Sequence, residues 1–245
     1  MHILYPSLPY ETATPDPLWE PEYRWAQAQG WQVRLFDVET NLFRPATADP
    51  TPALYRGWML TATEYATLAQ RTPLLVMPAE YLASHEATGW YEAVREFTIP
   101  STFRQPDNVP DFADGQTYFV KGLVKSFGTD SVVASPEQWQ QLLTKQQMGP
   151  NEQLFVREFV PLREKSEQRF FVVNGRAYGA AGAELPPRLV PVLNQLAGRR
   201  FYSLDVARTW TGEAVVVEVG DGQVSDLKEW QLDDFGATVL AALAQ

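Results

Sequence analysis

Short apolar runs alternate with amphipathic segments along the first hundred residues. This pattern predicts strands at 3–5, 33–36, 53–58 and 74–77, and helices at 17–30, 63–70, 79–86 and 91–97. Pro6 and Pro9 are expected to end the first strand, because proline cannot donate a hydrogen bond to a sheet. The β-α-β-α order is typical of a small α/β unit with a mainly parallel sheet.

A segment rich in Pro, Asp, Asn and Thr, residues 98–117, separates this unit from the rest of the chain. The later pattern predicts strands at 118–121, 131–134 and 154–160, a helix at 136–148 with Ser135 as its N-cap, a hairpin at 169–181 that turns at Asn174-Gly175, and a helix at 233–244. We therefore predict an α/β domain at 1–100 and an α+β domain at 101–245, divided into lobes at about 101–160 and 161–245. Ligand sites are common in the cleft between two such lobes.

Two acidic residues lie inside a second predicted hairpin, at 201–219. Its apolar, β-branched runs flank Thr211-Gly212, which predicts antiparallel strands joined by a two-residue loop. In that register Asp205 lies directly opposite Glu218. Two facing carboxylates repel unless a positive group lies between them, and Mg²⁺ held by carboxylates and substrate phosphates is one candidate. A solvated sheet face, with both acids in water, is the alternative.

Composition narrows the classes of partner. The chain has 245 residues and a formal net charge of −10, so no overall positive field would recruit DNA or RNA, although a local phosphate pocket is compatible with this charge. The absence of cysteine excludes thiol catalysis and zinc–thiolate sites. Because the N-terminus lacks signal-peptide features and no apolar run approaches the roughly 20 residues that span a bilayer, we expect a cytoplasmic protein without a membrane partner.

A glycine-bounded loop follows the strand that ends at Lys121. Gly122 and Gly128 permit close backbone approach, Lys121 and Lys125 supply positive charge, and Ser126 supplies a hydroxyl, so the loop could wrap a polyphosphate. It is not the Gly-x-x-x-x-Gly-Lys-Ser/Thr phosphate loop. A surface hairpin with two solvated lysines is the alternative.

Three arginines lie within otherwise apolar strands. Arg157 and Glu158 are adjacent, so their side chains must point to opposite faces of the strand. At least one of them therefore faces something other than the apolar core. A bound ligand is one candidate, and a solvent-exposed edge strand is the alternative. Arg169 shares a face with Phe171 and Val173, so it requires a bound anion or an ion pair with an acid of the same chain, such as Asp205 or Glu218. Arg56 ends a strand of the predicted parallel sheet, where such sheets bind ligands.

Taken in this order, the lysine before a glycine loop, the strand at 158–160, Arg169 and the hairpin acids resemble the ATP-grasp superfamily over roughly 118–230. The resemblance is strongest to the clade named for two arginines and a lysine, which includes a eukaryotic initiation-factor assembly protein. The lysine would correspond to Lys121 and the arginines to Arg157 and Arg169. The implied fold is an ATP-grasp fold, with a small N-terminal α/β unit followed by two α+β lobes that clasp a nucleotide.

The resemblance also implies ATP and Mg²⁺ as cofactors and assigns a role to each candidate residue. The implied nucleotide-binding residues are Lys121, Lys125, Ser126, Glu158, Phe159 and Val160; the implied metal ligands are Asp205, Glu218 and Asp221; and the implied catalytic residues are Arg157, Arg169 and Arg56, the last gripping a substrate carboxylate. Many ATP-grasp proteins have Glu-x-Asn at the metal strand, whereas Gly220 occupies the third position here. Either Asp221 supplies the missing oxygen, or the second metal position is weakened.

Two functions follow from the resemblance. One is an ATP-dependent ligase that joins a carboxylate to an amine through an acyl phosphate, with a peptide, protein or metabolite as acceptor. The other is an ATP-binding assembly or interaction protein without ligase chemistry, which the missing asparagine favours.

Overall fold

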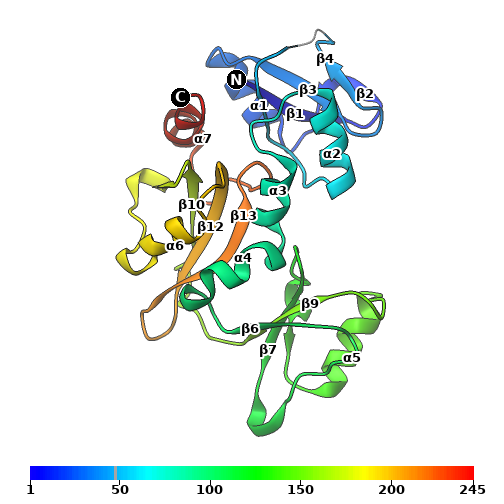
Figure 1. Ribbon diagram of the computed structural model, residues 1–245, viewed down its shortest axis with the longest axis vertical. Coiled ribbons are helices and arrows are strands. Elements are labelled where there is room, and N and C mark those ends of the chain that lie inside the picture. Colours follow the sequence, from blue (N-terminus) through cyan, green and yellow to red (C-terminus); the bar gives the residue numbers. More distant parts are fainter. Residues whose placement is uncertain (47–48) are drawn as a thin grey trace.

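In the computed structural model, which describes residues 1–46 and 49–245, the chain forms three sheets with helices packed against them (Figure 1). The N-terminal sheet has the order β2-β1-β3-β4, with β5 also paired to β1. Its strands are β1 (His2–Leu8), β2 (Glu11–Pro15), β3 (Val33–Asp37), β4 (Leu42–Arg44) and β5 (Ala53–Tyr55). The central pairs β1–β3 and β1–β5 are parallel, as predicted, and β2 and β4 pair antiparallel at the edges.

Four helices follow the strands of this first region: α1 (Glu20–Ala28), α2 (Ala62–Arg71), α3 (Pro78–His85) and α4 (Ala87–Val94). Helix α2 begins at a capping box, in which Thr61 accepts from the backbone N–H of Glu64 and the Glu64 carboxylate accepts from that of Thr61. The sequence thus predicted each helix to within a few residues.

Two strand predictions in this region are wrong. Strand β1 does not end at Pro6 but continues to Leu8. Pairing of β1 with β5 ends at Leu4, before Pro6. On that side the Pro6 carbonyl accepts a hydrogen bond from the Asp16 N–H. The N–H that proline lacks is therefore not needed for strand pairing. Residues 74–77 make only an isolated bridge, Ala53 to Leu74, and form no strand.

The middle-lobe sheet has the order β6-β9-β7-β8, all antiparallel, and one face is covered by α5 (Pro136–Lys145). Its strands are β6 (Ser101–Arg104), β7 (Tyr118–Gly122), β8 (Val132–Val133) and β9 (Leu154–Glu158). The Ser135 hydroxyl accepts from the Gln138 N–H at 3.3 Å, which confirms the predicted N-cap. Strand β6 lies in the segment expected to be a connection.

The C-terminal sheet has the antiparallel order β11-β10-β12-β13 and occupies the centre of the molecule. Its strands are β10 (Gln168–Val173), β11 (Arg176–Gly179), β12 (Phe201–Arg208) and β13 (Ala214–Asp221). Asn174 and Gly175 both have positive φ, of 48° and 79°, which confirms the predicted turn between β10 and β11. The remaining helices are α6 (Val190–Gln195), α7 (Leu232–Phe235), the π-helix η6 (Gly236–Leu240), α8 (Ala241–Leu243) and the 3₁₀ turns η1 (Arg95–Phe97), η2 (Ala113–Gly115), η3 (Gly128–Ser131), η4 (Ala180–Gly182) and η5 (Pro187–Leu189).

Both faces of the C-terminal sheet are buried, which explains its nearly continuous apolar strands. Phe171 and Phe201 pack with the N-terminal unit and Phe235, whereas Leu204 packs on the opposite face with Trp90 of α4. Thus α4 precedes residue 100 but packs against the C-terminal sheet, and the domain division at residue 100 stays a prediction. Within the described ranges, no helix has the length and apolarity required to cross a membrane.

The hairpin β12–β13 pairs Asp205 with Glu218, as predicted, although its loop differs. The strands are joined by residues 209–213 rather than by a two-residue turn. A β-bulge at Val217 restores the register, because Val206 pairs with Val216 while Asp205 pairs with Glu218. The predicted facing of the two acids is therefore confirmed, and the predicted loop is wrong.

Candidate functional site

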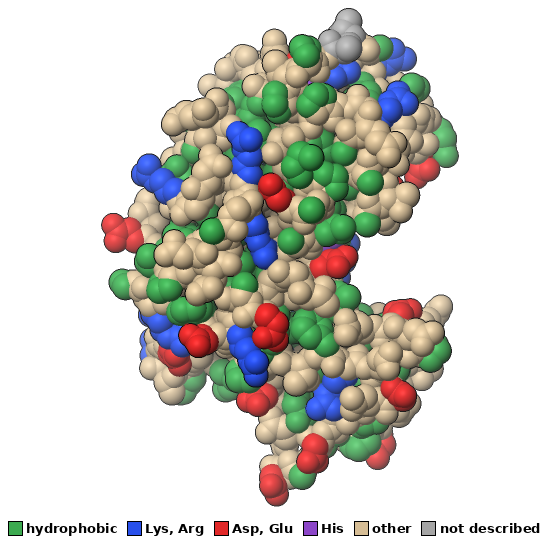
Figure 2. Space-filling model, viewed as in Figure 1, with side chains coloured by type: hydrophobic (Ala, Val, Ile, Leu, Met, Phe, Trp, Pro, Cys, Tyr) green, Lys and Arg blue, Asp and Glu red, His purple; other side chains and the backbone are tan. Residues whose placement is uncertain are grey.

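A cavity of about 660 Å³ lies where the three sheets meet. The surface is visibly hollowed between the part that carries α2 and the part that carries α5 (Figure 2). The cavity residues used below are Phe119, Lys121, Lys125, Ser126 and Arg157 from the middle lobe; Glu167, Arg169, Ser203, Asp205, Val217, Glu218, Gly220, Asp221, Val224, Ser225 and Asp226 from the C-terminal part; and Leu18, Trp19, Trp58, Met59 and His85 from the N-terminal part.

A row of charges crosses the C-terminal sheet at this cavity. Arg169, Asp205 and Glu218 are direct neighbours on the adjacent strands β10, β12 and β13. Arg169 binds Asp205 through two hydrogen bonds, from Nε and Nη2, each of 2.8 Å. It also pairs with Asp226, and Lys228 Nζ lies 2.8 Å from the second Asp205 oxygen. Intramolecular ion pairing, one of the two sequence interpretations of Arg169, is thus present.

These contacts set the protonation of the buried acid. Burial alone would raise the pKa of Asp205, but hydrogen bonding and charge from Arg169, followed by Lys228, hold it below its ordinary value. The same contacts raise the pKa of Arg169 and of Lys228 against the opposing effect of burial. Asp205 is therefore an ionised carboxylate that could accept a cation.

Lys121 of the middle lobe contacts Glu218, the last residue in the row of charges on the C-terminal sheet. Its Nζ bonds Glu218, and the lysine is buried, whereas the Glu218 side chain keeps 35% of its surface exposed. The following loop folds tightly, since the Gly122 N–H donates to the Lys125 carbonyl. Lys125 and Ser126 are exposed and line the cavity, so the structure brings these predicted phosphate-binding residues to one place.

Arg157 is a buried cation whose charge is not neutralised by an ion pair within the described ranges. Its guanidinium donates to the Val217 carbonyl at 2.8 Å, and at longer range to the hydroxyls of Ser101 and Thr98. The bulge at Val217 thus holds this arginine. Burial lowers the pKa of Arg157 to about 10, so the group stays protonated near neutral pH and would be stabilised by an anion.

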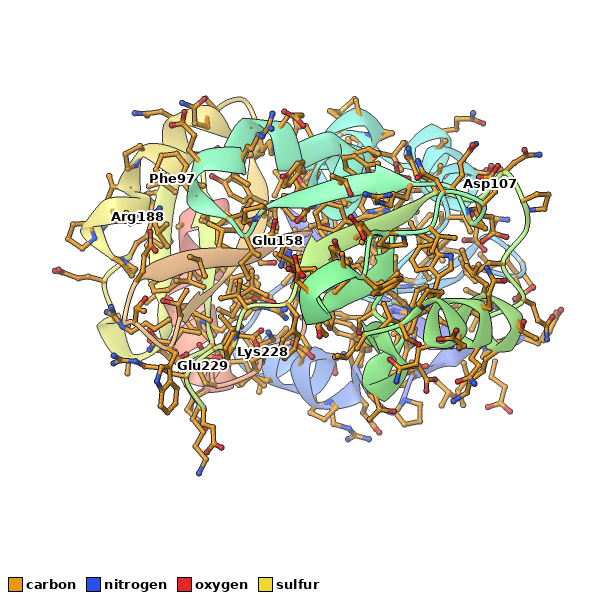
Figure 3. All side chains as sticks on the ribbon, turned by 90° about the horizontal axis from the view of Figure 1, so that it is seen from below. Phe97, Asp107, Glu158, Arg188, Lys228 and Glu229 are labelled. Carbon is orange, nitrogen blue, oxygen red and sulfur yellow. The ribbon has the colours of Figure 1, made fainter. Side chains whose placement is uncertain are left out.

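A second, apolar slot of about 290 Å³ adjoins the main cavity, and Phe119, Arg157 and Val217 line both. Glu158, Phe159 and Val160 form part of its wall. In Figure 3, Glu158 lies between the green strands of the middle-lobe sheet and the orange hairpin of the C-terminal sheet. The slot could accept a flat aromatic base beside the end of β9 and the two residues that follow it.

The structure places Arg56, interpreted from the sequence as a ligand for a substrate carboxylate, among partners of the same chain. Arg56 is fully buried, and its Nε and Nη2 each bind Glu22 at 2.8 Å. Its Nη1 donates to the carbonyls of Gly222, Gln223 and Ser225. With its donors committed, Arg56 ties α1 and β5 to the segment after β13, and it is a positioning residue.

The structure does not bring the side chain of Asp221, interpreted from the sequence as a metal ligand, beside that of Glu218. Residues three apart along a strand point to opposite faces, and the Asp221 side chain is wholly buried. Its Oδ1 accepts from the backbone and side-chain amides of Gln223, which in turn donates to the Tyr65 hydroxyl. Its Oδ2 has no hydrogen-bond partner among the described residues, and burial raises the pKa of Asp221 to about 7.

Asp221→Asn is expected to change the free energy of unfolding more favourably above pH 7 than at pH 4. Because the folded-state pKa is raised, the unfolded state loses this proton first, so the wild type loses stability as pH rises from about 4 to 7. Each unit of pKa difference corresponds to about 1.4 kcal/mol, which sets an upper bound of a few kcal/mol. Urea unfolding of both proteins at pH 5 and pH 8 measures the difference, and an equal mutational effect at both pH values would contradict the expectation.

The residues at the cavity fit a magnesium nucleotide. Asp205 and Glu218 supply the carboxylate oxygens that Mg²⁺ prefers, and Lys121, Lys125, Arg157 and Arg169 face the space between them. Phosphates would offer Lys121 and Arg169 new acceptors, which would free both carboxylates for the metal. The described residues contain no group of three or more acidic or histidine side chains arranged to hold a metal ion, so the remaining oxygen ligands would come from phosphate and water.

A side chain at position 220, where the usual metal strand has asparagine, would meet two serine hydroxyls in this chain. A Cβ atom at Gly220 would lie 2.7 Å from the Ser203 hydroxyl and 3.2 Å from that of Ser225. These two hydroxyls are hydrogen-bonded to each other at 2.8 Å, and Ser225 also donates to the Asp221 carbonyl. The hydroxyl pair therefore occupies the space that a side chain at position 220 would need.

Sequence analysis missed four charged residues beside Arg169 and Asp205, namely Glu167, Asp226, Lys228 and Glu229. Lys228 bridges Asp205 and Glu167, with Nζ–oxygen distances of 2.8 and 2.5 Å, and Glu229 accepts from the Arg169 backbone N–H. Figure 3 shows Lys228 and Glu229 together in the segment that follows the C-terminal sheet. The adjacent opposite charges of Asp226 to Glu229 were the available signal, but only the fold shows that the segment returns to β10.

Comparisons with known proteins place this geometry in a family. Residues 54–243 match the model of an ATP-grasp domain, family 3 of the clade named for two arginines and a lysine. No curated protein matches the sequence.

Solved structures share the fold at low sequence identity. A RimK-domain ATP-grasp protein from Sphaerobacter thermophilus has 18% identity and a TM-score of 0.65, with 99% of this chain and 98% of that chain covered. D-alanyl-alanine synthetase A from Vibrio cholerae has 14% identity and a TM-score of 0.60, with 100% and 99% covered. The ATP-grasp ligase PsnB, solved with a minimal precursor, Mg and ADP, has 10% identity and a TM-score of 0.59, with 99% and 98% covered.

These matches confirm the predicted fold class and the predicted superfamily, since the family model spans more than half of the chain. The chain is a member of the ATP-grasp superfamily, in the clade named for two arginines and a lysine.

Proposed function

We propose that this protein is an ATP- and Mg²⁺-dependent ligase that joins a carboxylic acid to an amine. The observation that carries the proposal is Arg157, a buried guanidinium without an ion-pair partner in the described chain, placed between an apolar slot and a cavity with three further cations. A nucleotide with its base in the slot and its phosphates in the cavity would neutralise this charge.

The proposed reaction has two steps, formation of an acyl phosphate and its reaction with the amine, and residues of this chain lie beside the reacting groups. A carboxylate oxygen attacks the γ-phosphorus, ADP leaves, and an acyl phosphate forms. The amine nitrogen attacks the acyl carbon, inorganic phosphate leaves and the amine loses a proton. Lys121, Arg157 and Arg169 stabilise the negative charge on the transferred phosphoryl group, and backbone groups near Glu158 to Val160 orient the base. Bound at Asp205 and Glu218, Mg²⁺ would supply further charge stabilisation.

The proposal agrees with what is known of proteins of the same fold. D-alanyl-alanine synthetase is by its name a ligase of an acid and an amine, and PsnB is a ligase solved with Mg and ADP. These likenesses are at low identity and support the type of reaction rather than the substrates.

Lys121→Ala is expected to weaken binding of the ATP analogue AMPPNP in the presence of Mg²⁺ by about tenfold to a hundredfold, because a hydrogen bond to a charged group contributes about 1.5–3 kcal/mol. Calorimetric titration measures the affinity. Lys145→Ala is the matched control, since Lys145 pairs with Asp130 on the surface and lies outside the cavity. Unchanged affinity of Lys121→Ala, or no binding by the wild type, would contradict the proposed nucleotide site.

An ATP-binding assembly protein without ligase chemistry is the second candidate. The occupied space at Gly220 favours it, because one oxygen ligand of the usual metal strand cannot be present. Hydroxylamine separates the two candidates, since it converts an acyl phosphate to a hydroxamate. Hydroxamate formation together with ADP release from ATP and an acid supports the ligase, and nucleotide binding without either product, over a panel of acids, supports the assembly protein.

A further inference from the structure

The end of the cavity that the N-terminal part of the chain forms is apolar. Leu18, Trp19, Trp58 and Met59, here called the apolar end, come from the segment before α1 and the segment after β5. Trp58 is 47% exposed and Leu18 is 71% exposed, so both present large apolar surfaces. Exposed apolar surface that continues into a cavity is characteristic of a binding site.

Within the described residues, the apolar end offers no free positive charge to a ligand. Arg56 stacks behind it, with its guanidinium carbon 5.1 Å from the centre of the Trp19 ring, but all its donor nitrogens are bound within the protein. His85 also lines the cavity, and burial lowers its pKa to about 4, so it is neutral near pH 7. Among the described residues that line the cavity, the cationic partners for a substrate carboxylate therefore lie at the other end.

The aromatic surface is held rigid before any ligand binds. The Trp58 indole N–H donates to Asp16 Oδ2 at 3.0 Å, and its ring packs edge-to-face on Trp19 at 6.3 Å. The Tyr55 hydroxyl donates to the Trp58 carbonyl at 2.8 Å. A pre-ordered aromatic surface binds apolar groups with little loss of conformational entropy.

We propose that the carboxylic acid activated by this protein carries a bulky apolar side chain, aromatic or branched aliphatic, which packs on Trp58 and Leu18. The proposal rests on the proposed function, since phosphoryl transfer requires the acid group to lie beside Lys121, Arg157 and Arg169. With the carboxylate at that end, the rest of the acid extends toward the apolar end. Specificity then comes from apolar contact rather than from a second ion pair.

Binding of N-acetylated amino acids in the presence of AMPPNP and Mg²⁺ tests this proposal. N-acetyl-phenylalanine and N-acetyl-leucine are expected to bind at least about tenfold more tightly than N-acetyl-alanine and N-acetyl-glutamate, since differences of this size in an apolar pocket are usual. Calorimetry and tryptophan fluorescence measure the affinities. Trp58→Ala should lose the preference and Trp58→Phe should keep it, with thermal melting as the check that each variant is folded.

Trp210→Ala is the matched control, because Trp210 is 72% exposed at the β12–β13 loop and does not line the cavity. Equal affinity for all four acids, no binding of any of them to the AMPPNP complex, or a preference retained in folded Trp58→Ala would overturn the proposal and leave the nucleotide site standing. Absence of AMPPNP binding itself would overturn the proposed function, and this proposal with it.

Discussion

Replacement of Arg56 by methionine is expected to lower the free energy of unfolding by about 3–5 kcal/mol, the cost typical of breaking a buried ion pair from one side. Both Arg56 and Glu22 are buried, and the bidentate contact between them is the main compensation for burying the Glu22 charge. Methionine would leave Glu22 with the Tyr5 hydroxyl and would leave three carbonyls of residues 222–225 without their shared donor.

Thermal and urea unfolding of three variants test this expectation. Glu22→Gln combined with Arg56→Met should recover part of the loss, because the uncompensated charge is gone. Arg24→Ala breaks a surface pair with Glu20 in the same helix, and it should change the free energy of unfolding by less than about 1 kcal/mol. A loss for Arg56→Met no larger than that for Arg24→Ala would show that the buried pair contributes little.

The same pair illustrates what sequence analysis missed. Arg56 was correctly placed at the carboxyl end of a strand, where ligands often bind, but its partner lies 34 residues earlier in the chain. Glu22 lies within the helix predicted at 17–30, and no prediction was made for its burial. Only the fold brings Glu22 of α1 to Arg56, so the sequence predicted the position of this arginine and not its contacts.

For the hairpin acids, the sequence was informative for a different reason. Alternation along a strand sets which residues share a face, and Asp205 and Glu218 face each other although the loop is longer than predicted. The bulge that restores the pairing lies within the uniform run Val215 to Val217, where no change of residue type marks it. The edge strands β2, β4 and β6 were missed because they are short and mostly lack the apolar pattern of the central strands.

The cations of the site were predicted in part. Lys121, Arg157 and Arg169 each interrupt an apolar strand, and a charge in such a run needs a partner. The partner of Lys121 belongs to the other lobe, 97 residues later, so sequence spacing could not identify it. Lys228 lies in a polar segment without a strand or helix pattern, and its contact with Asp205 follows only from the return of the chain past β10.

Asp205→Asn is expected to abolish the magnesium dependence of AMPPNP binding. An asparagine offers one neutral oxygen where the carboxylate offers two charged ones, and a hard divalent cation binds the former far more weakly. The measurement is the ratio of AMPPNP affinities with Mg²⁺ and with EDTA. That ratio should fall to about one in the variant, and a ratio equal to that of the wild type would exclude Asp205 as a metal ligand.

The same substitution is expected to lower the free energy of unfolding by roughly 2–3 kcal/mol, because Arg169 and Lys228 lose a shared anion while Arg169 keeps Asp226. Since the pKa of Asp205 is lowered in the folded protein, its ionised form stabilises the wild type above about pH 4, and this advantage over the variant should shrink as pH falls below that value. Asp226→Asn is the matched control. It removes the other carboxylate bound to Arg169, but its side chain is 77% exposed, so the change in unfolding free energy should stay below about 1 kcal/mol at every pH. If the two variants were equally stable, Arg169 would not depend on its buried partner, and the row of charges across the sheet would be a surface feature rather than the support of the site.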